Sequence, residues 1–331
     1  MGWPGAALAS YDRHTAHRRP PDPIRTVGLS RRNLLAERSQ AMGRAHALVR
    51  KQQPVGSVGP RAPRSRKRGA GSVRYEFLGP FRVLNGKHEI RISASKMEVL
   101  LVTLLTRPGQ VVRTDQLIDE IWAGDPPRRA LASVHVYVSQ LRKLLSCPER
   151  EDSPIRTRPP GYLVVLGEDR ADWCEFRSLV QKARECLREG RHEVAELLCR
   201  SALDLWRGPV LDGVKRGPLT EVLAAWLVET RLECLEMRLD AALEMGRHRE
   251  LVGELFALTS EHPFRESFYR QLMLALYRSE RQAEALRVYM TAWNTLNREL
   301  GVRPCRSLQQ LHQSILRADG SLHRLPLAVG S

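Results

Sequence analysis

One stretch of the chain, residues 128–146, combines an apolar helix face with a basic outer face. Its apolar residues Val134, Val138, Leu141 and Leu145 recur at helical spacing and lie within a narrow arc. The opposite face is small, polar and basic: it carries Arg129, Ala132, Val136, Gln140 and Lys143, with Ser133 and Tyr137 beside them. Such a helix can enter the major groove of DNA. In isolation the pattern fits an ordinary solvated surface helix better, and the surrounding elements reverse that preference.

The residues from 73 to 127 predict a small sheet followed by two helices. Strand-like alternation begins at Val73, and Asn85–Gly86 marks a hairpin turn. Ser95 is the expected N-cap of the first helix, with Glu98 as its partner in a capping box. Thr114 is expected to cap the second helix.

Two short strands around a Pro-Pro-Gly turn follow the stretch, within residues 155–166. A sheet, three helices and a hairpin together predict a winged helix-turn-helix. Residues 128–146 then take the recognition position, and the turn from Arg158 to Gly161 is the tip of the wing.

From Ala171 the pattern is helical, with no strand signal. Seven amphipathic segments are predicted: 172–189, 191–207, 219–245, 247–261, 264–279, 281–300 and 306–318. Leu251 and Ala285 stand 34 residues apart in similar contexts, which is the tetratricopeptide period. The large apolar side chains of Leu205, Trp206 and Trp226 are expected to belong to the core rather than to a ligand pocket.

The predicted fold is mainly α with a small β component, a winged helix-turn-helix followed by an all-α tetratricopeptide-like domain. The expected boundaries are 73–168 for the winged helix, 169–320 for the helical domain and 321–331 for a tail. Residues 1–72 hold 15 Lys or Arg against 3 Asp or Glu and cannot bury a core. They are either a basic disordered arm that adds salt-dependent affinity for nucleic acid, or a non-native extension.

The net charge of +16 lies mostly in that arm, since residues 73–168 carry only +3 and residues 169–331 only +1. The overall charge is therefore no proof of a DNA-binding domain. The sequence has no apolar run of membrane-spanning length and no secretion signal. Its six scattered cysteines lack a CxxC pair, so a reduced cytoplasm is the expected setting.

Signatures of catalysis are missing as well. The sequence contains no Walker loop, no GxGxxG after a strand, no GxSxG and no HExxH. We therefore expect neither an enzyme nor a bound cofactor or metal.

Three segments resemble the effector domain of OmpR-type regulators and, more closely, the Streptomyces antibiotic regulatory protein family. They are TDQLIDEIW at 114–122, VYVSQLRKLL at 136–145 with the preceding Pro-Pro, and IRTRPPGY at 155–162. Residues 202–211, 299–304 and 308–316 resemble the bacterial transcriptional activation domain that follows the winged helix in this family. Together the resemblances cover about 73–318, and residues 1–72 have no counterpart.

The resemblance implies roles for individual residues. Ser133, Val136 and Gln140 match base-facing positions. Val136 would contact a thymine methyl and Gln140 would pair with adenine. The family commonly has Arg at the Gln140 position, which puts guanine recognition there in doubt.

Other positions match phosphate contacts, namely those of Trp122, Arg142 and Thr157. Arg158 is a candidate for the minor groove or its flanking phosphates. Two alternatives stay open: Trp122 is mostly core, and Arg142 bridges to a helix end. The expected DNA-contacting set is Arg128, Arg129, Ser133, Val136, Tyr137, Gln140, Arg142, Lys143, Trp122, Thr157 and Arg158.

The resemblance implies a cytoplasmic DNA-binding activator of a secondary-metabolite (antibiotic) gene cluster. Two protomers would bind double-stranded DNA on direct repeats about one helical turn apart. The helical domain would support the homodimer and contact RNA polymerase holoenzyme. A rival interpretation is a tetratricopeptide-type scaffold whose winged helix docks protein. That scaffold would explain the charge of +3, but the cations crowd onto the recognition helix and the wing, at Arg128, Arg129, Arg142, Lys143, Arg156 and Arg158.

Overall fold

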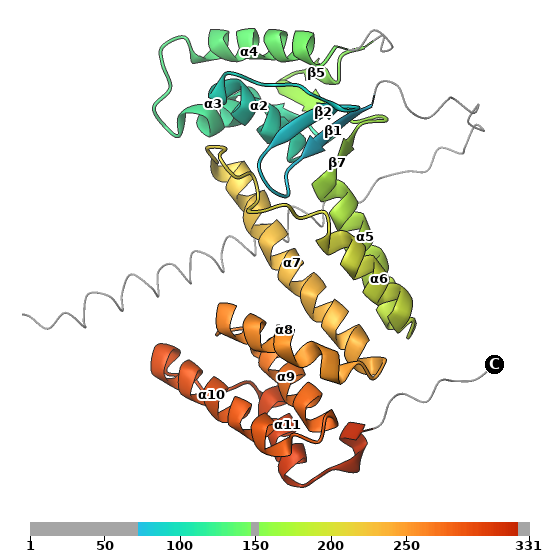
Figure 1. Ribbon diagram of the computed structural model, residues 1–331. Helices are drawn as coiled ribbons and strands as arrows, with labels where there is room; N and C mark the ends of the chain where they lie inside the picture. Colours follow the sequence, from blue (N-terminus) through green and yellow to red (C-terminus); the bar gives the residue numbers. More distant parts are fainter. Residues whose placement is uncertain (1–71, 147–151, 324–331) are drawn as a thin grey trace, which may run out of the picture.

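In the computed structural model, residues 72–146 and 152–323 are described (Figure 1). The predictions for the basic arm and the end of the tail concern residues 1–71 and 324–331, which lie outside the described part. The described chain is mainly helical with a small β component, as predicted.

The winged helix contains two small sheets and three helices. The first sheet has the order β3-β2-β1-β7, and the second has the order β4-β6-β5. The elements are β1 (Val73–Glu76), β2 (Arg82–Asn85), β3 (His88–Glu89), α2 (Ser95–Leu105), β4 (Val112–Arg113), α3 (Thr114–Trp122), α4 (Ala130–Leu144), β5 (Ile155–Arg158), β6 (Gly161–Val164) and β7 (Arg170–Ala171).

Strand β7 was not predicted. It is two residues long, too short to show alternation, and it pairs in parallel with β1 through Arg74 and Arg170. The first sheet is thus completed by residues that adjoin the helical domain.

The predicted helix caps are wrong. Residue Ala94, not Ser95, is the N-cap of α2, and its carbonyl accepts the N–H groups of Met97 and Glu98. Thr114 is the first residue of α3, and its hydroxyl donates to the carbonyl of Pro160 at 3.1 Å. The Thr114 side chain therefore fastens α3 to the wing turn instead of capping its own helix.

All seven predicted helices of the C-terminal region are confirmed. They are α5 (Asp172–Arg188), α6 (His192–Leu203), α7 (Pro218–Glu244), α8 (His248–Glu261), α9 (Glu266–Arg278), α10 (Gln282–Leu300) and α11 (Arg306–Leu316), followed by the 3₁₀ turn η1 (Gly320–His323). Helix α6 ends four residues before the predicted 207 because the connection to α7 turns back onto the winged helix. There the N–H of Leu211 donates to the carbonyl of Phe77 at 2.9 Å.

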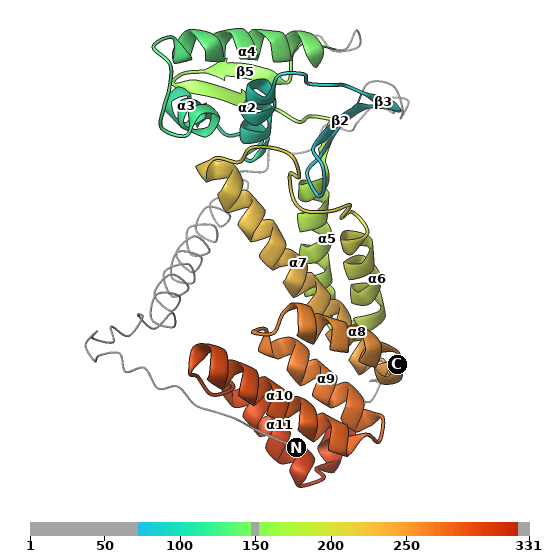
Figure 2. The same ribbon diagram turned by 60° about the vertical axis from the view of Figure 1, so that its left-hand side comes forward.

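Two hydrophobic cores organise the molecule. The first runs from Val73 to Met237 and joins the winged helix to α5, α6 and the first half of α7. The second runs from Leu239 to Ile315 and fills the hairpins α8–α9 and α10–α11. Helix α7 belongs to both and crosses between them (Figures 1 and 2). The apolar core is therefore continuous across the predicted boundary at 168/169.

The tetratricopeptide-like character of the helical region is confirmed by its core. Leu251 in α8 and Ala285 in α10, one period apart, are both buried. Leu205, Trp206 and Trp226 pack half-buried against the first core, as expected. Among the helices that the structure describes, none has the length and apolarity to cross a membrane.

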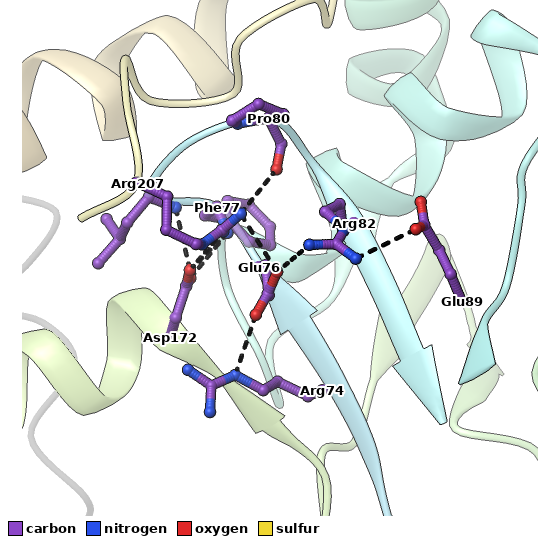
Figure 3. A network of polar contacts seen from close by, with 9 residues as sticks. Arg74, Glu76, Phe77, Pro80, Arg82, Glu89, Asp172 and Arg207 are labelled. Atoms are coloured by element: carbon purple, nitrogen blue, oxygen red, sulfur yellow. Dashed lines mark hydrogen bonds and ion pairs between the residues drawn. The ribbon is translucent and has the colours of Figure 1, made fainter. Parts of the chain in front are cut away.

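A polar network fastens the first sheet to the helical region (Figure 3). The carboxylate of Asp172, at the start of α5, accepts the N–H groups of Phe77 at 2.8 and 2.9 Å and of Leu78 at 3.0 Å. The guanidinium of Arg207 reaches both Asp172, at 3.3 Å, and Glu76, at 3.2 Å. Burial raises the pKa of Asp172 although these donors favour its charged form.

Candidate nucleic-acid interface

Helix α4 lies along the end of the molecule that points away from the C-terminal hairpins (Figures 1 and 2). Its apolar face is buried as predicted: Val134, Val138, Leu141 and Leu145 are at most 2% exposed. The helix proper is shorter than the basic stretch, since Arg128 and Arg129 precede its first residue, Ala130.

The outer face of α4 is open to solvent. All five of its predicted residues are exposed: Arg129, Ala132, Val136, Gln140 and Lys143. Val136 is 51% exposed, so its apolar side chain is open to a partner. Such a side chain can meet an apolar group of a partner, and the amide of Gln140, one turn further, can donate and accept hydrogen bonds.

Ser133 and Tyr137 are half-buried at the side of this face. The Ser133 hydroxyl donates to the carbonyl of Arg129, the N-cap of α4, at 3.2 Å. The Tyr137 ring stacks on the Trp122 ring, with the two ring centroids 6.4 Å apart and an interplanar angle of 24°.

The side chain of Trp122 packs against the first core, in agreement with the alternative that it is mostly core. Its indole nitrogen is buried without a hydrogen-bond partner, so in this conformation it cannot donate to a phosphate. The Nζ of Lys96 lies over the ring at 5.2 Å from the centroid. Sequence reasoning missed Lys96, an exposed cation at the start of α2. Only the folded contact with Trp122 brings it to the edge of α4.

Arg142 connects the recognition helix to the wing. Its Nε donates to the carbonyl of Ile155 at 3.0 Å, and its Nη2 donates to the hydroxyl of Thr157 at 2.8 Å. The expected alternative was a bridge to a helix end, and the observed partner is strand β5. The pair fixes the angle between α4 and the wing, and it leaves other N–H groups of the guanidinium for an outside acceptor.

The wing lies close to β4 at Gly161, the last residue of its turn. A Cβ on Gly161 would lie 1.9 Å from the carbonyl oxygen of Val112, so only glycine fits where β6 pairs with β4. At the tip, Arg158 is exposed and forms no ion pair with the described residues. Arg156, by contrast, pairs with Asp152 at 3.3 Å.

Three cations at the outer face of α4 are not neutralised by acidic side chains of the described residues. The cations Arg128, Arg129 and Lys143 form no ion pair with the part of the chain that is described. Within the same part, no cluster of three His, Cys, Asp or Glu side chains could hold a metal ion.

Comparison with known proteins supports this architecture. The family model for the C-terminal domain of transcriptional regulatory proteins matches residues 87–164, and the model for the bacterial transcriptional activator domain matches residues 171–316. The mycobacterial structure described as "Mycobacterium tuberculosis EmbR in complex with low affinity phosphopeptide" superposes with a TM-score of 0.70. Its sequence identity is 33%, and the match covers 74% of this chain and 65% of that one.

Two regulators from Streptomyces are similar over most of this chain. Regulatory protein AfsR of Streptomyces coelicolor is 41% identical over 82% of this chain, which spans only 27% of AfsR. Regulatory protein DnrI of Streptomyces peucetius is 34% identical over 76% of this chain and 95% of its own length. Because both domain models match in order and nearly all of DnrI is covered, the chain belongs to the Streptomyces antibiotic regulatory protein family of transcriptional regulators, with an OmpR-type winged helix followed by a bacterial transcriptional activator domain.

Proposed function

We propose that this chain is a sequence-specific DNA-binding transcriptional activator that reads the major groove with α4. The observation that carries the proposal is the outer face of α4, where exposed Val136 and Gln140 are flanked by cations without acidic partners among the described residues. DNA phosphates pair with such cations, and base edges make hydrogen bonds and apolar contacts with the side chains between them.

The side chains of the outer face support a particular readout. Val136 is placed for apolar contact with a thymine methyl, and the Gln140 amide for a bidentate pair with adenine. Arg158, at the tip of the wing, takes a minor-groove or phosphate contact beside them. Lys96 is added to the predicted phosphate contacts because it lies over Trp122.

Family membership supports the wider role. Two copies bind direct repeats about one helical turn apart, so that both recognition helices face the same side of the DNA. The helical domain then contacts RNA polymerase holoenzyme and supports the dimer. The genes under control belong to a secondary-metabolite cluster.

The test is a footprint of the full chain on the DNA that flanks its own gene, at two salt concentrations. A protected pair of direct repeats that is lost as salt rises supports the proposal. Diffuse, sequence-blind binding or no binding supports the rival scaffold.

Variants locate the reading face. We expect Gln140→Ala to weaken specific binding by about 1–3 kcal/mol and to relax the preference at one base pair. Arg158→Ala should weaken binding to all sequences and, if it contacts a phosphate, lower the salt slope by about one. Arg249→Ala, which removes an exposed arginine on α8, is the matched control and should change neither quantity.

A further inference from the structure

The first turn of α7 is capped by a residue of the helix-turn-helix. Glu120 of α3 is 2% exposed, and its carboxylate accepts the N–H of Leu219 in the first turn of α7. The hydroxyl of Thr220 donates to the other carboxylate oxygen at 3.1 Å. An anion is favoured at a helix N-terminus, because the N–H groups and the helix dipole both point toward it.

The backbones of α3 and α7 also approach closely at this point. A Cβ on Gly217, the N-cap of α7, would lie 2.6 Å from a carboxylate oxygen of Glu120 and 2.8 Å from its Cα. Glycine at 217 thus permits a contact that any side chain would push apart.

This contact adds to the attachments between the winged helix and the helical region, which also share an apolar core and the pairing of β1 with β7. The network of Asp172 and Arg207 fastens the two regions at the first sheet (Figure 3). An attachment on α3 limits rotation of α7 that attachments at the first sheet alone would allow. Helix α7 begins at the first contact, beside α3 (Figure 2).

Helix α7 connects the Glu120 contact to the second core. It has 27 residues, and its far half contributes Leu239 and Leu243 to the core of the C-terminal hairpins. A helix of that length spans about 40 Å, so a change of about 10° at its first turn moves its far end by about 7 Å.

We infer that Glu120 is a positioning residue. It fixes the direction of the C-terminal hairpins relative to α4, and thereby sets which spacing of two DNA repeats lets neighbouring copies touch. This inference rests on the proposed function. One added base pair turns the second site by about 35° and shifts it by about 3.4 Å. Hairpins held in one direction relative to α4 therefore favour one spacing, whereas hairpins free to change direction tolerate several.

A set of variants separates direction from simple stability. Glu120→Ala removes the cap, and Glu120→Gln keeps an amide oxygen for the N–H of Leu219. Gly217→Ala pushes the contact apart from the other side. Its matched control is Gly208→Ala in the same connection, where a new Cβ would meet its nearest atom at 3.8 Å.

The first measurement needs no DNA. Spin labels at Ser139→Cys on α4 and Arg298→Cys on α10, with Cys147 and Cys305 replaced by Ser, report the distance between the recognition helix and the far hairpins. We expect one narrow distance distribution for the background protein, for Glu120→Gln and for Gly208→Ala. Glu120→Ala and Gly217→Ala should broaden or shift it.

The second measurement compares probes with one repeat and with two repeats at spacings from 8 to 14 base pairs, a range that covers about one turn of DNA. All variants should bind a single repeat within about twofold of the parent, because α4 itself is unchanged. Glu120→Ala and Gly217→Ala should bind several spacings alike, where the parent favours one by about tenfold. That preference is equivalent to about 1.4 kcal/mol.

The inference is overturned if both Glu120→Ala and Gly217→Ala keep the parental distance distribution and spacing preference. If Glu120→Ala does not fold, Gly217→Ala decides alone. If the parent binds no specific DNA, the proposed function fails, and the label distances alone support or overturn the role of Glu120.

Discussion

Replacing Asp172 by alanine should destabilise the protein strongly without touching the candidate DNA face. The Asp172 carboxylate is 1% exposed and accepts two buried backbone N–H groups, those of Phe77 and Leu78. Leaving a buried donor without an acceptor costs about 1–3 kcal/mol. Two orphaned donors therefore cost about 2–6 kcal/mol. Arg207 loses one of its two acidic partners as well.

Part of this cost is offset, because the charged carboxylate is itself unfavourable where it lies. Burial raises the pKa of Asp172, so removing its charge returns some desolvation energy. We therefore expect a loss near the middle of the range, about 3–4 kcal/mol. At about 2–4 °C per kcal/mol for a chain of this size, Tm should fall by about 10 °C.

Urea unfolding followed by far-UV circular dichroism measures the free energy of unfolding directly. Asp212→Ala is the matched control, because Asp212 lies in the same interface with an exposed side chain, and its change should stay within about 0.5 kcal/mol. Asp172→Asn should fall between the two, since its amide keeps one acceptor oxygen. A loss below about 1 kcal/mol for Asp172→Ala would refute the reasoning, because one orphaned donor alone should cost that much.

Three further predictions test the wing, its link to α4 and the buried glutamate. Gly161→Ala should cost about 3 kcal/mol, because its Cβ meets backbone 1.9 Å away, whereas Gly253→Ala in open space on α8 should stabilise by about 0.5–1 kcal/mol in the same unfolding assay. In a double-mutant cycle, Arg142→Ala and Thr157→Val should couple by about 1 kcal/mol, and additive effects would show that their hydrogen bond contributes nothing. Burial raises the pKa of Glu120, so the folded protein holds this proton more tightly than the unfolded chain. The free energy of unfolding of the wild type relative to Glu120→Gln should thus rise as pH falls from 7 toward the ordinary value of 4.5, and a difference independent of pH contradicts this.

Local patterns in the sequence predict the elements of this fold well. Apolar spacing alone identifies the buried face of α4 and all seven C-terminal helices, because each helix must bury one stripe whatever it packs against. The caps at Ser95 and Thr114 fail for a related reason. A hydroxyl at a helix start can be used by any nearby acceptor, and for Thr114 the acceptor is Pro160, 46 residues away.

Contacts between distant segments are not visible in such patterns. Glu120 has the sequence context of a solvated acid on the polar side of α3. In the fold it is buried and accepts the N–H of Leu219, which lies 99 residues away in the sequence. Strand β7 and the cation of Lys96 over Trp122 likewise exist only after the chain has folded. The sequence predicts which face of α4 is open, but not that Trp122 has its indole nitrogen covered.

The low charge of the winged helix is compatible with DNA binding once its charges are assigned to places. Many of its cations are paired internally: Arg74 with Glu76, Arg82 with Glu89, Arg113 with Asp115 and Arg156 with Asp152.

By contrast, the cations of α4 and of the wing tip have no acidic partner among the described residues, and Glu120 is buried away from them. Charges more than about 8 Å apart are largely screened at physiological salt, so a phosphate at α4 senses the nearby cations rather than the sum of +3. The net charge of +3, which favoured the scaffold interpretation, therefore sums a surface of internally paired cations and a surface of unpaired ones. The surface beside α4 is the one on which a polyanion would be held.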